Sequence, residues 1–159
     1  MKYFIELINN HILITTIASW FIAQVIKVLI NFHFTKKIDW ERLVGSGGMP
    51  SCHSATVMAL FTVTTFFYGP GSFEFAVTAI LAIIVMYDAR GVRRETGKQA
   101  VLLNQIRDYL LFGGEKKGKP KPDFSDENLK ELVGHTPFQV LVGAILGVLI
   151  GVLSGIFWK

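Results

Sequence analysis

Four long apolar runs divide the chain, and they limit it to one kind of fold. The runs cover residues 12–34, 54–68, 73–87 and 137–158. A helix needs about 20 apolar residues to cross a bilayer, a length that the first and last runs reach and that the middle two approach. Because 51% of the 159 residues are hydrophobic, an ordinary soluble domain is excluded. We therefore predict one all-α domain, residues 1–159, built as a membrane bundle of about four transmembrane helices.

The first run is predicted to be a retained helix and not a signal peptide. It is long, one lysine with an acid nearby precedes it, and no small-x-small cleavage site follows. The chain has a single cysteine, Cys52, which excludes an internal disulfide.

Short connections between the runs predict the topology. Residues 36–51 and 90–135 would lie on one side of the membrane, and residues 69–72 on the other. Thirteen of the sixteen lysines and arginines fall on the first side, all except Lys2, Lys27 and Lys159. By the positive-inside rule that side is cytoplasmic, which predicts a multi-pass protein of the cell membrane. A basic surface would also attract anionic headgroups.

Residues 95–112 show a different pattern, with apolar residues at helical spacing on one face and charged residues on the other. This predicts an amphipathic helix that lies in the membrane interface or caps the bundle. Residues 113–128 are rich in Gly, Pro, Lys and Asp and are predicted to form a loop. No nucleic-acid motif is present, so no nucleic-acid partner is expected.

Two short polar strings, residues 47–53 and 134–137, come directly before apolar runs. Each places one histidine, His53 or His135, at the start of a predicted helix. A helix start offers unpaired N–H groups and the positive end of the helix dipole, which together suit a phosphoryl group. The structural alternative is that the glycines and prolines only begin helices. Because both strings are predicted on the same membrane side, we favour a phosphate site.

Polar residues also occur inside the first run. Gln24, Lys27 and Asn31 lie at i, i+3 and i+7, so they share one stripe of the helix. Charged groups at this depth usually face a polar cavity or a partner, although a lysine can also snorkel to the surface. Lys27 is therefore a candidate site residue.

A charged cluster follows the third run: Asp88, Arg90, Arg93 and Arg94. Arginine holds phosphate through paired donors. The alternative is a stop-transfer cluster with an internal ion pair. Topology alone does not call for an acid, so Asp88 is the most suggestive member.

These motifs resemble a known superfamily. Residues 50–53 (PSCH) resemble the Pro-Ser-Gly-His motif of the type-2 phosphatidic acid phosphatases, and residues 134–137 (GHTP) resemble their last motif. The chain as a whole is identified as a member of the divergent branch, small membrane proteins related to acid phosphatases and vanadium haloperoxidases. Further residues fit that branch: Lys27, 47–50, 88–94, 99–100, Asn104, Val140, Gly143 and Gly147.

The resemblance implies a mechanism without metal or cofactor. His135 would attack phosphorus to form a phosphohistidine, and His53 would protonate the leaving oxygen. The substrate would be a lipid phosphate monoester or pyrophosphate in the membrane. Its phosphate oxygens would be held by the backbone around Ser51 and Cys52, by Lys27, and by an arginine.

The chain departs from the superfamily pattern in three places. Lys27 and Arg42 are too far apart for the first motif, the Ser-Arg before the last histidine is absent, and Gln139 replaces an aspartate. Glu131 or Asp88 could orient His135 instead.

Two alternatives to a phosphohistidine enzyme remain open from the sequence. One is a protein that binds phosphate or phospholipid headgroups without catalysis, or a small transporter. Another makes the histidines and Asp88 metal ligands. A homodimer is also expected, because four helices make a thin wall around a polar cavity.

Overall fold

The computed structural model describes residues 1–36, 48–108 and 135–158, and these residues form helices and short connections without strands. The helices are α1 (Lys2–Ile8), α2 (His11–Thr35), α4 (Cys52–Tyr68), α5 (Phe73–Arg90), α6 (Val92–Asp108) and α7 (Pro137–Phe157). The predicted all-α fold is confirmed.

The four predicted spans correspond to α2, α4, α5 and α7. By length and composition, three stretches can cross a membrane: α2, α7, and Phe73–Asn104, which comprises α5 and most of α6. The remaining helix, α4, is apolar but has only 17 residues. It is the most enclosed of the four because α2, α5 and α7 all pack against it. A helix covered by protein on several sides does not need a full bilayer-spanning apolar surface.

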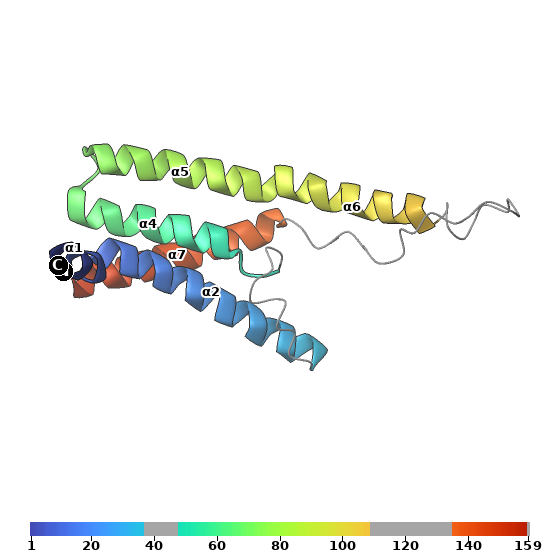
Figure 1. Cartoon of the computed structure of the whole chain (residues 1–159), viewed down its shortest axis with the longest axis horizontal. Helices are drawn as coiled ribbons and strands as arrows, with labels where there is room; N and C mark the ends of the chain where they lie inside the picture. The colour runs from blue at the N-terminus through green and yellow to red at the C-terminus, as the bar shows by residue number, and fades with distance from the viewer. Residues whose placement is uncertain (37–47, 109–134, 159) are drawn as a thin grey trace, which may run out of the picture.

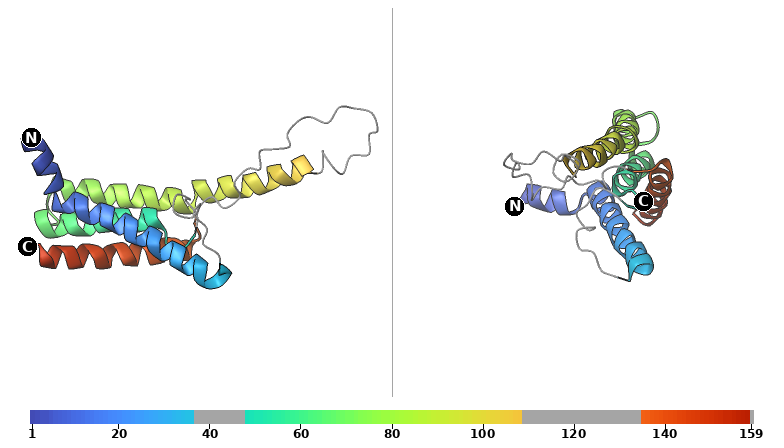
Figure 2. Two further views of the ribbon diagram at one scale, coloured as in Figure 1. Left: turned by 60° about the horizontal axis from the view of Figure 1, so that its bottom comes forward. Right: turned by 90° about the vertical axis from the view of Figure 1, so that its right-hand side faces the viewer.

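The helices are arranged so that the two helix starts that carry a histidine lie at the same end of the bundle. Figures 1 and 2 show both chain termini at one end, and the starts of α4 and α7 with the ends of α2 and α5 at the other. We call this other end the histidine end, because His53 and His135 belong to the starts of α4 and α7.

Side-chain caps define where α4 and α7 begin. Ser51 Oγ accepts a hydrogen bond from the Ser54 N–H at 3.3 Å. Thr136 and Gln139 form a capping box, in which each side chain accepts from the other residue's backbone N–H. Pro137 occupies the first turn of α7, where its missing N–H costs nothing. Both helices therefore start beside a histidine.

A stripe of glycines joins α7 to α4. Its members, spaced four residues apart, are all buried: Gly143, Gly147, Gly151 and Gly155. A Cβ at Gly143 would collide with the Ser51 backbone oxygen, and one at Gly147 with the Ala55 backbone oxygen. Small residues at this spacing let two membrane helices approach until their backbones touch. The α4–α7 contact is the most extensive among the described helices for this reason.

The predicted amphipathic helix is present as α6, which begins three residues before residue 95. Figures 1 and 2 show that it continues the line of α5 beyond the other helices. It therefore does not cap the bundle. Residues 109–112 and the predicted loop 113–128 lie outside the described residues.

The close contact at Gly147 predicts that alanine in place of glycine lowers the stability of the protein, which is the opposite of the usual effect within a helix. Gly147→Ala should destabilise the protein by roughly 1–3 kcal/mol, because the new methyl group would collide with the Ala55 backbone oxygen and would lie 2.9 Å from Met58 Cβ. Without that contact, alanine in a helix would be favoured over glycine by about 1 kcal/mol. Gly71→Ala, in open space between α4 and α5, is the matched control and should change thermal stability little. A Gly147→Ala protein as stable in detergent as wild type would contradict the close packing.

Candidate functional site

The two histidines lie together at the histidine end. The ring centroids of His53 and His135 are 6.1 Å apart, with the ring planes at 61°. The convergence predicted from the topology is confirmed. His135 is 1% exposed, whereas His53 is half-buried.

Three elements hold His135 in this position. Its backbone N–H donates to the Ala89 carbonyl at 3.1 Å, near the end of α5. Directly after it, α7 begins, and the Gln139 carbonyl accepts from the Ser51 N–H at 3.1 Å, at the start of α4. The position of the imidazole is therefore set by backbone contacts with both α5 and α4.

The bond from Ser51 uses one of the backbone groups that the resemblance assigns to phosphate binding. The Ser51 N–H donates to the Gln139 carbonyl, and the assignment of Ser51 and Cys52 to phosphate binding stays a prediction. Ser51 is fully buried, and its hydroxyl bonds to Ser54. The first-turn amides of Cys52 and His53 point out of the start of α4, as at any helix start.

Lys27 enters the same region from α2. Its side chain is 2% exposed, and its Nζ lies 3.8 Å from Cys52 Sγ. Cys52 Sγ lies in turn 3.7 Å from His53 Nδ1. Because the ammonium group is inside the bundle, the alternative that Lys27 snorkels to the surface is wrong. A buried cation at membrane depth is a feature of ion and substrate sites.

Both ring nitrogens of His135 are buried and have no hydrogen-bond partner among the described residues. Burial lowers the pKa of His135 from 6.5 to about 4, because the charged imidazolium loses its hydration. The Gln139 side chain opposes this shift, and positive charge on His53 and Lys27 adds to it. At neutral pH the imidazole is therefore uncharged, which is the nucleophilic form.

Gln139 has a structural role at this point. Its Oε1 accepts from the Thr136 N–H at 3.0 Å, and its own N–H donates to Thr136 Oγ1 at 3.3 Å. This is the reciprocal arrangement of a capping box. The residue that stands in place of the superfamily's aspartate thus stabilises the start of α7 and brings no negative charge to His135.

The structure describes only some of the other side chains that were predicted to belong to the site. Asp88 is half-buried and precedes Ala89, and Arg90 is exposed at the end of α5. Arg93 and Arg94 belong to α6 by their backbone, but their side chains, like all of Glu131, lie outside the described residues. Within the described residues, no group of three His, Cys, Asp or Glu side chains is placed to hold a metal ion.

One buried polar atom adds to the predicted set. Gln24 Oε1, one turn before Lys27 on α2, has no hydrogen-bond partner among the described residues. The i, i+3 spacing of Gln24 and Lys27 is the sequence signal that marks it. Burial of an unpaired amide is costly unless a ligand or water bonds it.

Comparison with known proteins identifies the family. The sequence profile described as "Divergent PAP2 family" matches residues 8–150. The chain belongs to the divergent PAP2 family. A relative from Bacillus subtilis (strain 168), the "uncharacterized membrane protein YuiD", is 42% identical over 156 residues, which are 96% of this chain and 99% of the relative. No solved structure matches the chain. The resemblance drawn from the two histidine motifs is thereby confirmed, as is membership among membrane proteins.

The lowered pKa of His135 has a measurable consequence for stability. Between about pH 6.5 and pH 4 the unfolded chain takes up a proton at residue 135 that the folded protein does not, so folding stability falls as the pH falls through this window. The loss is on the order of 3 kcal/mol, at about 1.4 kcal/mol per pH unit. Thermal unfolding in detergent should show this loss in wild type and not in His135→Gln. Identical pH profiles for the two proteins would contradict the buried, neutral imidazole.

Proposed function

We propose that this divergent PAP2 protein is a membrane phosphatase or phosphotransferase that acts on a lipid phosphate monoester or pyrophosphate through a phosphohistidine. The observation that carries the proposal is the state of His135: a buried imidazole, neutral at physiological pH, with both nitrogens unpartnered among the described residues. A second imidazole stands beside it. A nucleophile and an acid are the two groups that phosphoryl transfer of this kind needs.

The proposed reaction has two steps that share these groups. A ring nitrogen of His135 bonds to phosphorus as the bond to the lipid oxygen breaks, and protonated His53 gives its proton to that oxygen. His53, now neutral, then takes a proton from a water molecule that attacks the phosphohistidine. Inorganic phosphate leaves and both imidazoles return to their starting state. With an alcohol in place of water, the same site would transfer the phosphoryl group.

Positive charge at the histidine end supports phosphate binding. Lys27 places a buried ammonium group beside Cys52. The starts of α4 and α7 both point their positive dipole ends at this region. An anion that enters the site would therefore meet one full positive charge and two helix starts. We propose Asp88 and Glu131 as the residues that orient His135.

We propose that the site faces the cytoplasm and takes its substrate from the inner leaflet of the cell membrane. The lysine and arginine content of the connections at this end supports that orientation through the positive-inside rule. The substrate would reach the site laterally from the bilayer, so the membrane lipid itself is the proposed partner.

Mutation of the histidines tests the enzyme directly. His135→Ala should reduce phosphate release from phosphatidate or prenyl phosphate to background, and His53→Ala should reduce it by about 10²–10⁴-fold, the range for loss of a general acid. His33→Ala, which removes an exposed histidine from the end of α2, is the control and should keep full activity. Undiminished release by His135→Ala would exclude the phosphohistidine.

A second candidate is a protein that binds phosphate or phospholipid headgroups without turnover. It is favoured by Gln139, whose side chain caps α7 and supplies no charge to the imidazole. In this case orthovanadate would bind wild type and His135→Ala equally and no phosphate would be released. Lys27→Met should weaken binding at least tenfold under either function, whereas Lys98→Met, on the exposed side of α6, should not.

A further inference from the structure

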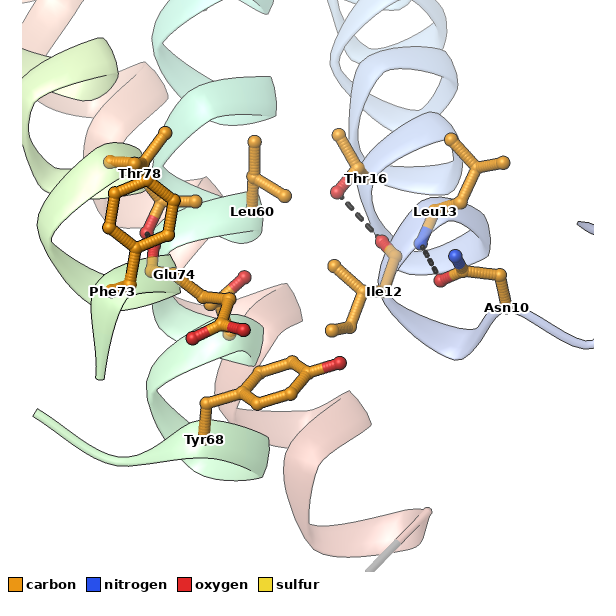
Figure 3. Close-up of a pocket in the computed structure, with 11 residues that line it drawn as sticks. Asn10, Ile12, Leu13, Thr16, Leu60, Tyr68, Phe73, Glu74 and Thr78 are labelled. Carbon is orange, nitrogen blue, oxygen red and sulfur yellow. Dashed lines mark hydrogen bonds between the residues drawn. The ribbon is translucent and has the colours of Figure 1, made fainter.

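A groove at the opposite end of the bundle has no part in the chemistry described so far. It lies between α2, α4 and α5, has a volume of about 470 Å³, and is shown in Figure 3. This volume is within the range of small-molecule binding sites. The groove is lined by Asn10, Ile12, Leu13, Thr16, Leu60 and Thr64, together with five residues from Tyr68 to Thr78.

Apart from the Glu74 carboxylate and the Tyr68 hydroxyl, which Figure 3 also shows at the groove, the walls are more apolar than their composition indicates. Thr16 Oγ1 donates to the Ile12 carbonyl at 2.8 Å, and Thr78 Oγ1 donates to the Glu74 carbonyl at 2.8 Å. Figure 3 shows the first of these bonds, with the Thr16 hydroxyl turned along its own helix. Asn10 Oδ1 is likewise engaged with the Leu13 N–H at 3.0 Å. Because the hydroxyl groups of Thr16 and Thr78 donate to the backbone of their own helices, both threonines can present their methyl groups to a ligand.

The groove is open on the side that faces lipid. Both α2 and α5 pack against α4, but they do not pack against each other along their lengths. Leu13 and Val77, on opposite walls, are both exposed. A hydrocarbon chain could therefore enter from the bilayer between α2 and α5 without passing through water.

Helix register places this groove in line with the phosphate site. On α4, Leu60 and Thr64 lie seven and eleven residues after His53, which puts all three on one face. On α2, Thr16 lies eleven residues before Lys27. On α5, Thr78 lies eleven residues before Ala89, whose carbonyl holds His135. Seven and eleven residues are close to two and three whole turns, so each helix presents groove and site residues on the same side.

We propose that this groove binds the hydrocarbon chain of the lipid phosphate whose head is held at His53 and His135. The inference rests on the proposed function and names its substrate class: a lipid phosphate with a long hydrocarbon chain. Along α4, Leu60 is about 12 Å and Tyr68 about 24 Å from Cys52, at about 1.5 Å per residue. Half of the hydrocarbon core is about 15 Å thick. Only a long chain reaches from the head to the groove.

The test is a chain-length series at constant headgroup, with the groove filled by mutation. Wild type should have at least tenfold higher kcat/KM for dioleoyl phosphatidate than for dihexanoyl phosphatidate. Val77→Trp and Leu60→Trp should reduce the value for the long lipid by tenfold or more and leave the short lipid unchanged. Val77 is exposed, so its variant remains informative if Leu60→Trp fails to fold. Leu149→Trp, on the lipid-facing side of α7, is the control.

The outcomes distinguish a failure of the groove proposal from a failure of the proposed function. Loss confined to long chains in the groove variants supports the groove, and repeating the series with geranyl and decaprenyl phosphates tells acyl from isoprenoid chains. Equal turnover of long and short lipids by wild type, or full activity of both groove variants on long lipids, overturns the groove and leaves the proposed function standing. If wild type neither binds nor hydrolyses any of these lipids, both proposals fall.

Discussion

Backbone contact between α4 and α7 is the constraint on which the rest of the structure depends. Gly143 and Gly147 bring α7 against the backbone of Ser51 and Ala55, and no larger residue would allow this approach. The contact aligns the starts of the two helices, which places His135 beside His53. A change in the glycine stripe would therefore act on the site from a distance, through the position of an imidazole and without contact to any ligand.

The charged groups described at the histidine end suit the proposed anion site. Lys27 carries a buried ammonium group, and His135 stays neutral because burial and nearby positive charge lower its pKa. At the proposed site, a bound phosphate would interact favourably with the Lys27 ammonium group and would stabilise the folded state in proportion to its occupancy.

The helices and the meeting of the two histidines were predictable from the sequence, because successive apolar runs that each cross the membrane alternate in direction and leave one topology. The packing partners were not predictable in this way. Hydrophobic periodicity indicates which face of a helix is buried, but not which helix covers it, so the contact of Gly151 and Gly155 with α4 emerges only from the fold. The same holds for the capping role of Gln139 and for the use of the Ser51 N–H by α7. Both depend on where α7 begins to within one residue.

The most direct test of the account is whether His53 and His135 respond together to one anion. Orthovanadate added to protein with ¹⁵N-labelled histidines, in detergent at pH 7, should shift the ring nitrogen signals of both residues with a single dissociation constant. The signals of His11 and His33 should stay in place. A shift at one of the two site histidines without the other, or no shift at either, would contradict a shared phosphate site.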